Sequence, residues 1–197
     1  MLAVFVVSRI PGLLPPNFSA AYALAFCAGL YFPGALAWWL PLGVMLVTDL
    51  GLNAWYASHG VANVFSPLSL LSQLGSYVGY VVLIGLGRRF KPRDSGVRLL
   101  GGGILGALVF YLITNTTSWL SDPGYAKTLA GWIQALTTGL PGLPSTWTFF
   151  LKTLLSGGLF TALFVGAMKF SAAESPAEKG VQPEAGEEEA APDEAKA

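Results

Sequence analysis

The sequence predicts an all-α membrane protein, built as a bundle of six transmembrane helices. Hydrophobic residues make up 53% of the 197-residue chain and charged residues only 11%, whereas a soluble domain carries about 25% charged residues. The apolar residues also gather in runs as long as a membrane-spanning helix requires, about 17 to 25 residues. Together these observations exclude the soluble globular class.

The apolar runs define the expected spans in chain order. Four of them reach spanning length: 35–53, 67–87, 99–119 and 147–170. The run 18–32 is shorter and is expected to span together with its flanks. The first run, 1–14, is interrupted by Arg9 and Pro11, so five spans are the alternative. The predicted transmembrane domain covers residues 1–170.

Positive charge predicts the orientation. The only dense cluster of Lys and Arg lies between two apolar runs, at 88–98, and cytoplasmic loops carry an excess of these residues. We therefore expect this loop to face the cytoplasm, with the segments 53–66 and 120–146 outside. By alternation the C-terminal tail, 171–197, is also cytoplasmic. Arg9 fits less well, because it would lie near the outer end of the first span.

Two further segments are expected outside the bundle core. Apolar residues within 125–136 recur at helical spacing among polar ones, which predicts an extra amphipathic helix at the outer surface. The tail 171–197 contains eight acidic residues, two lysines and no aromatic residue. Such a segment cannot bury enough apolar surface to fold, so we predict a disordered acidic tail.

Asp49 is the only acid inside an apolar run. A carboxylate in hydrocarbon is costly unless it is paired or hydrated, so an intramembrane acid is a candidate functional residue. Asn53 lies four residues later on the same helix face. The pair could form the polar wall of a site open to the outside. The alternative is an interfacial Asp that is satisfied by water or by a neighbouring helix.

A second polar segment, 115–119, ends the run 99–119 at the same expected depth. Asn115 could line a pocket there, and Trp119 could stack on a ligand. The alternative is helix termination, with hydrogen bonds from these side chains to the local backbone.

No catalytic or metal-binding signature is present in the sequence. Cys27 is the only cysteine, which excludes a disulfide or a cysteine-built metal site within one chain. His59 is the only histidine and lacks partner ligands for a metal. The sequence has neither a Gly-x-Ser-x-Gly elbow nor a Walker-type phosphate loop. We therefore predict no enzymatic activity, no metal and no cofactor.

Short motifs in a fixed order carry a family resemblance over residues 1–170. They are Pro16-Asn17-Phe18-Ser19, Gly29-Leu30-Tyr31-Phe32, Thr48-Asp49-Leu50, Thr114-Asn115, Tyr125-x-Lys127-Thr128 and Phe149-Phe150-Leu151-Lys152. With these motifs the chain resembles a bacterial membrane family that is a domain of unknown function. Members of that family are often described as similar to the substrate-binding S component of energy-coupling-factor (ECF) transporters.

The resemblance implies a small-solute binding subunit in the bacterial plasma (inner) membrane. S components are compact six-helix bundles that bind a vitamin, metal ion or other micronutrient from outside. They dock on a membrane scaffold (T) component that is driven by two cytoplasmic ATPases. The residues expected around an outward-facing pocket are Asn17, Asp49, Asn53, Asn115, Trp119, Tyr125 and Lys127, with the segment 122–146 as a gate.

Small residues four apart, Ala21, Ala25 and Gly29, form a flat helix face. The resemblance implies that this face docks on the scaffold component. Packing inside the bundle is the alternative. A different function also stays open: a structural or assembly subunit of a larger membrane complex, with no ligand. An intramembrane enzyme is disfavoured, because no nucleophile and base can be paired.

Overall fold

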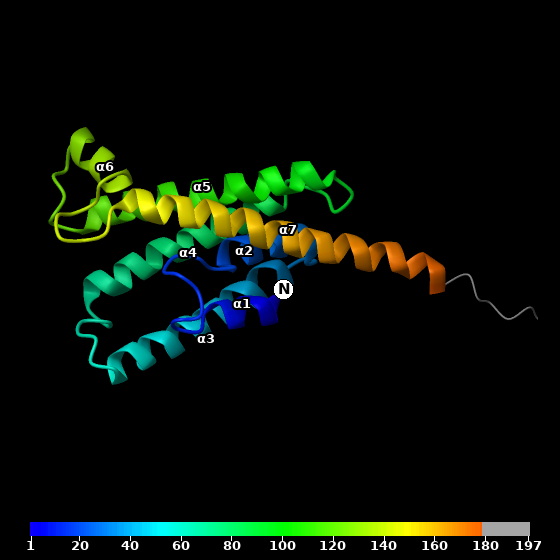
Figure 1. The fold of residues 1–197 in the computed structure, drawn as a ribbon, viewed down its shortest axis with the longest axis horizontal. Helices are drawn as coiled ribbons and strands as arrows, with labels where there is room; N and C mark the ends of the chain where they lie inside the picture. The colour runs from blue at the N-terminus through cyan, green and yellow to red at the C-terminus, as the bar shows by residue number, and fades with distance from the viewer. Residues whose placement is uncertain (179–197) are drawn as a thin grey trace, which may run out of the picture.

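The computed structural model describes residues 1–178 and is all-helical over that range, as predicted. Seven helices follow one another along these residues (Figure 1). Their bounds are α1 Leu2–Ser8, α2 Ala21–Tyr31, α3 Leu36–Ser58, α4 Pro67–Gly87, α5 Gly96–Ser121, α6 Leu129–Leu136 and α7 Thr146–Glu178.

Four of the helices, α3, α4, α5 and α7, are long and apolar enough to cross a membrane. Large apolar side chains such as Trp39, Val47 and Leu155 are exposed on their surfaces, which suits contact with lipid and indicates a membrane protein. The predicted count of six spans is not confirmed. Helix α1 has seven residues and α2 has eleven, so α2 is about 16 Å long against a hydrocarbon core of about 30 Å.

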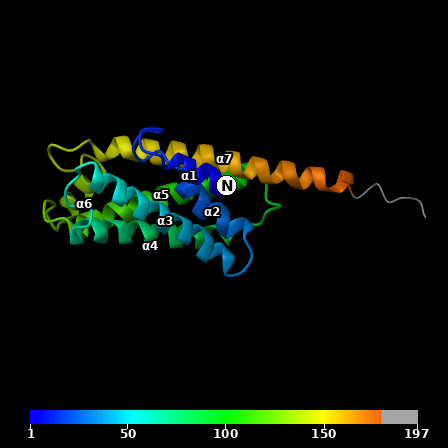
Figure 2. The ribbon, with the colours of Figure 1, turned by 90° about the horizontal axis from the view of Figure 1, so that it is seen from below.

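Helix α2 is the buried centre of the bundle. Residues 21–30 are all buried, and the helix contacts α1, α3, α4, α5 and α7 (Figures 1 and 2). Its closest approach is to α4. A methyl group added to Gly29 would lie 2.1 Å from the carbonyl oxygen of Ile84, and one added to Gly87 would lie 2.0 Å from that of Phe26. These two glycines therefore let the two backbones touch.

This packing places the small residues of α2 inside the protein. Ala21 and Ala25 are fully buried, and Gly29 faces the backbone of α4. The face that we considered for docking thus packs against the chain's own helices. In this fold it leaves no surface that a scaffold protein could reach.

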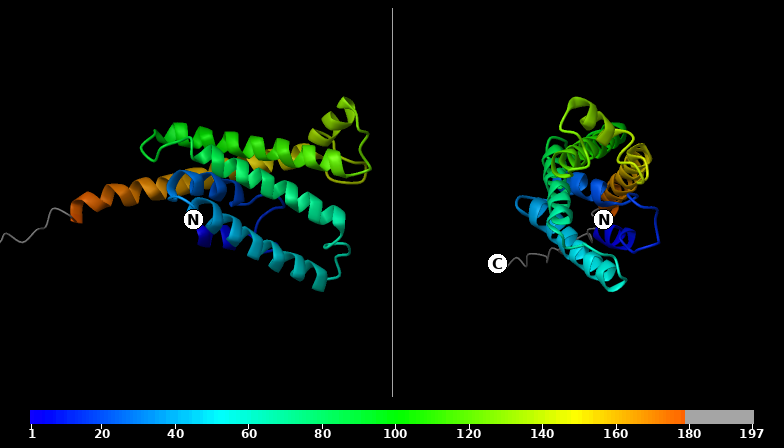
Figure 3. Two further views of the ribbon diagram at one scale, coloured as in Figure 1. Left: turned by 180° about the vertical axis from the view of Figure 1, so that it is seen from behind. Right: turned by 90° about the vertical axis from the view of Figure 1, so that its left-hand side faces the viewer.

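The short length of α2 leaves half of the bundle without a central helix. Near its end, α2 packs against residues 84–87 of α4, beside the basic loop 88–95. Its first residue, Ala21, follows the N-terminal strap, residues 9–20, which loops out from α1 and returns to α2 (Figure 1). The end-on view in Figure 3 shows the long helices arranged around α2. On the far side of Ala21, toward the α6 end of the bundle, the chain forms the strap and not a further part of the central helix.

Two peripheral segments can be compared with the predictions. A helix is present within 125–136, but α6 begins four residues later than expected, after Thr128, whose hydroxyl accepts a hydrogen bond from the amide of Gly131. Helix α7 continues to Glu178, beyond the predicted end of the last span at 170. The predicted tail is therefore helical over its first eight residues, and 179–197 lies outside the described residues.

Candidate functional site

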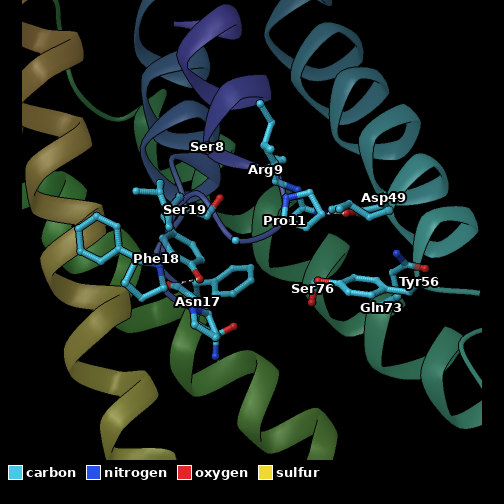
Figure 4. Close-up of a pocket in the computed structure, with 18 of the residues that line it drawn as sticks. Ser8, Arg9, Pro11, Asn17, Phe18, Ser19, Asp49, Tyr56, Gln73 and Ser76 are labelled. Atoms are coloured by element: carbon cyan, nitrogen blue, oxygen red, sulfur yellow. Dashed lines mark hydrogen bonds and ion pairs between the residues drawn. The ribbon is translucent and has the colours of Figure 1, made fainter. Parts of the chain in front are cut away.

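A cavity of about 440 Å³ lies at the N-terminal end of α2, between the strap and helices α3, α4 and α5. Its size falls within the range of about 300 to 1,000 Å³ that is usual for small-molecule sites. Figure 4 shows the strap along one side and Asp49, Gln73 and Ser76 along the other. The polar groups that line it come from Ser8, Arg9, Asn17, Ser19, Tyr22, Asp49, Tyr56, Gln73, Ser76 and Tyr80.

A second cavity of about 200 Å³ adjoins the first. The two share the side chains of Asn17, Tyr22, Ser76 and Phe110, so we treat them as two lobes of one space. The smaller lobe extends toward α5 and α7 and is lined there by Asn115. The complete site is therefore polar on several sides, although the helices around it are predominantly apolar.

An ion pair fastens the strap to α3. Arg9 donates to one carboxylate oxygen of Asp49, and the hydroxyl of Tyr77 donates to the other at 2.8 Å. Asp49 is 8% exposed, so its charge is both enclosed and compensated, as an intramembrane acid requires. The two opposite charges cancel, so this wall adds no net charge to the cavity.

Aromatic rings form the remaining wall. The rings of Tyr80 and Phe110 are stacked, with centroids 5.0 Å apart, and Tyr22 is tilted against Phe110 at 4.8 Å. The hydroxyl of Tyr22 donates to the carbonyl oxygen of Asn17 at 3.4 Å. Such a wall offers a ligand apolar ring surface beside hydrogen-bonding groups.

Four of the predicted site residues lie at or beside the cavity. Asn17 lines both lobes, Asp49 lines the larger lobe and Asn115 the smaller one. Asn17 has a φ of 62°, a left-handed conformation that Asn adopts more readily than most residues. Asn53 does not line the cavity itself. Its side-chain amide donates to the side chain of Gln73 at 3.3 Å, and Gln73 lines the cavity.

The other three predicted residues form a separate cluster at the α6 end. The indole of Trp119 donates to the carbonyl oxygen of Ala126 at 2.9 Å. The ammonium group of Lys127 donates to the carbonyl oxygens of Trp119 and Asp122. Tyr125 is mostly buried, and burial, followed by the nearby Asp122 carboxylate, raises the pKa of its hydroxyl. None of the three lines either lobe, so the structure gives them contacts that hold the segment 122–128.

Lys127→Met is expected to loosen the segment 122–128. The substitution removes the cation that bonds two carbonyl oxygens at the end of α5, at a cost of about 1 kcal/mol for this exposed contact. Amide hydrogen exchange in 122–128 should then be roughly fivefold faster. Lys91→Met, in the exposed loop at the opposite end, is the control. Unchanged exchange in Lys127→Met would contradict a fastening role for Lys127.

The whole helical region matches one family. The profile of DUF6580 covers residues 1–178. The chain belongs to DUF6580, a family of unknown function. No curated protein and no solved structure matches the chain. Membership of a family of unknown function is therefore confirmed, whereas no comparison links DUF6580 to the S components of ECF transporters.

The cavity of this DUF6580 chain also contains residues that we did not predict. Among them are Arg9, Gln73 and Ser76, and Tyr77 contacts Asp49 beside them. Arg9 had a signal in the sequence: among residues 1–87 it and Asp49 are the only charged side chains. Two opposite and otherwise isolated charges in apolar segments are expected to pair. Gln73 and Ser76 had no comparable signal, because they carry no charge and lie in the interior of α4, where nothing in the sequence indicates their partners.

Proposed function

We propose that this chain is a membrane-embedded binding protein for a small polar solute, of the S-component type. The observation that supports the proposal best is the polar cavity at the N-terminal end of α2. Polar groups are costly within the depth of a membrane unless they are bonded to one another or serve a ligand. Helix packing alone needs no polar space of about 440 Å³ at this position.

The cavity suits a ligand without net charge. Arg9 and Asp49 neutralise each other, and the remaining polar lining consists of amides and hydroxyls such as Asn17, Gln73 and Ser76. These groups can both donate and accept hydrogen bonds. A solute with several hydrogen-bonding groups and a flat or apolar part would meet both them and the ring of Phe110.

We also propose that the cavity opens to the outside of the cell. The basic loop 88–95 lies at the opposite end of the bundle from the segments 59–66 and 122–145, and the positive-inside rule assigns such a loop to the cytoplasm. Helix α2 would then close the cytoplasmic half. In transport of this type, a membrane scaffold component with two ATPases would supply the energy, docking on a helix other than the enclosed α2.

Ser76→Trp tests the binding function. Ser76 lines both lobes, so a tryptophan there fills the space that they share. The purified protein is expected to retain a small polar compound from native membranes, and the variant should retain at least about tenfold less, as measured by mass spectrometry of the extracted compounds.

Ser72→Trp is the matched control, because Ser72 lies one turn earlier on α4 and is exposed. Equal retention by Ser76→Trp and Ser72→Trp, or no retained compound in the unmodified protein, would contradict the proposal.

A second experiment identifies the partner from the proteins that co-purify with the chain in mild detergent. A scaffold with two ATPases supports the transport role. An unrelated complex would instead favour the structural or assembly subunit.

A further inference from the structure

The strap separates the polar cavity from an apolar groove. This groove, of about 480 Å³, runs between α1 and α7. It shares Ser8 and Leu14 with the cavity. The cavity and the groove therefore lie on two sides of one short stretch of chain. The other groove residues are Ala3, Val4, Val7, Leu13 and Phe160.

No part of the described chain fills this groove. Within residues 1–178, the backbones of α1 and α7 do not approach each other closely. Val4, Val7 and Leu13 are exposed, and together with the other lining residues they form a surface that is almost wholly apolar. A polar solute gains no binding free energy from such a surface, whereas a hydrocarbon chain gains free energy by burying its apolar surface there.

The boundary between the polar and apolar sides is sharp. The hydroxyl of Ser8 donates to the carbonyl oxygen of Phe5 at 2.7 Å and accepts from the amide of Ala20 at 3.2 Å, so its polar atom is already bonded within the chain. Beside it, Phe18 on the cavity side meets Phe160 on the groove side, edge to face, with ring centroids 6.0 Å apart. Two aromatic rings thus stand at the junction.

We propose that the ligand is an amphiphile, with a small uncharged or zwitterionic head and a single apolar chain. This inference rests on the proposed binding function and adds the chemical class of the ligand. The head lies in the cavity near Asn17, Gln73 and Ser76, where the paired Arg9 and Asp49 leave no net charge. The chain leaves the cavity beside Leu14, which lines both spaces, and lies in the α1–α7 groove.

The test uses monoacylglycerols, which have an uncharged polar head and one apolar chain. Butyryl, octanoyl and dodecanoyl glycerol are compared with glycerol by equilibrium dialysis against the full chain in nanodiscs, and empty nanodiscs measure simple partition into lipid. We expect binding above the empty nanodiscs that strengthens with chain length, because each added methylene group finds apolar surface in the groove. Glycerol alone should bind weakly.

Two substitutions separate the head site from the chain site. Ala3→Trp fills the groove from the exposed face of α1, and Ser76→Trp fills the cavity. Each should weaken dodecanoyl glycerol binding at least about tenfold. Ala57→Trp, at an exposed position on α3 outside both spaces, should leave it unchanged. The ligand-free melting temperature of each variant checks the fold, and Ser76→Leu replaces Ser76→Trp if the latter does not fold.

The outcomes distinguish the two proposals. If Ser76→Trp removes the compound retained from native membranes but Ala3→Trp has no effect on any probe, the ligand is purely polar; the amphiphile is then overturned and the binding function stands. If neither substitution changes the binding of any compound, both proposals are overturned. Binding that equals partition into empty nanodiscs, at every chain length, also overturns the amphiphile.

Discussion

Asp49→Ala is expected to lower the free energy of unfolding by about 3 kcal/mol. Removing one partner of an enclosed ion pair costs about 3 to 5 kcal/mol, because the remaining charge is left without compensation. The lower end applies because the side chain of Arg9 keeps 22% of its surface exposed. The substitution also leaves the hydroxyl of Tyr77 without its acceptor. Thermal unfolding in detergent micelles measures the change.

A double-mutant cycle shows whether the loss arises from the unpaired charge. Arg9→Met combined with Asp49→Ala should be less destabilising than the sum of the two single substitutions, because no isolated charge remains. Tyr77→Phe, which removes one hydrogen bond, should cost only about 1 kcal/mol. If the effects of Arg9→Met and Asp49→Ala on the free energy of unfolding are strictly additive, the ion pair does not hold the strap on α3.

The same substitution should affect the site. Arg9 is the first residue of the strap, and its bond to Asp49 is the polar contact that joins the strap to α3. In Asp49→Ala we therefore expect faster amide exchange over 9–20 and weaker binding in the cavity, while membrane insertion of the four long helices is unchanged. If Asp49→Ala shows faster exchange over 9–20 but binds ligand as well as the unmodified protein, then binding does not require the strap to be held on α3.

The long helices could be predicted from the sequence because their signal is local. The run 67–87 coincides with α4, and 99–119 lies within α5. The expected span over the run 18–32 is not confirmed, for a physical reason. An apolar run has the same composition whether lipid or protein surrounds it, and α2 is enclosed by protein on all sides. Hydropathy alone therefore does not distinguish a spanning helix from a short helix such as α2, which is buried in the centre of the bundle.

The candidate site was predictable only in part, for a related reason. Asp49 could be recognised because a charge in an apolar run is unusual by itself. Gln73 and Ser76 matter only because the fold places α4 across the cavity from the strap, and no local sequence pattern indicates that arrangement. Trp119 and Lys127 lie outside the cavity, because polar and aromatic side chains at a helix end also bond the local backbone, as they do in this structure.

Gly29→Ala is expected to destabilise the protein by about 3 kcal/mol or more. The added methyl group would lie 2.1 Å from the carbonyl oxygen of Ile84, and a backbone atom within a helix cannot move aside as a side chain can. The whole of α2 must therefore shift away from α4, which makes this a severe case of overpacking. Gly87→Ala should behave in the same way, because its methyl group would lie 2.0 Å from the carbonyl oxygen of Phe26.

Two other glycines provide matched controls. An added methyl group at Gly85 meets only a ring atom of Trp38 at 3.9 Å, and one at Gly43 meets nothing within 4 Å. Alanine at these positions should be neutral, or should stabilise its helix by up to about 1 kcal/mol. Because α2 closes one end of the cavity, Gly29→Ala should also lose ligand binding, whereas Gly43→Ala should keep it. Equal melting temperatures for Gly29→Ala and Gly85→Ala would mean that α2 is not enclosed by α4, and the face formed by Ala21, Ala25 and Gly29 would again be open to a partner.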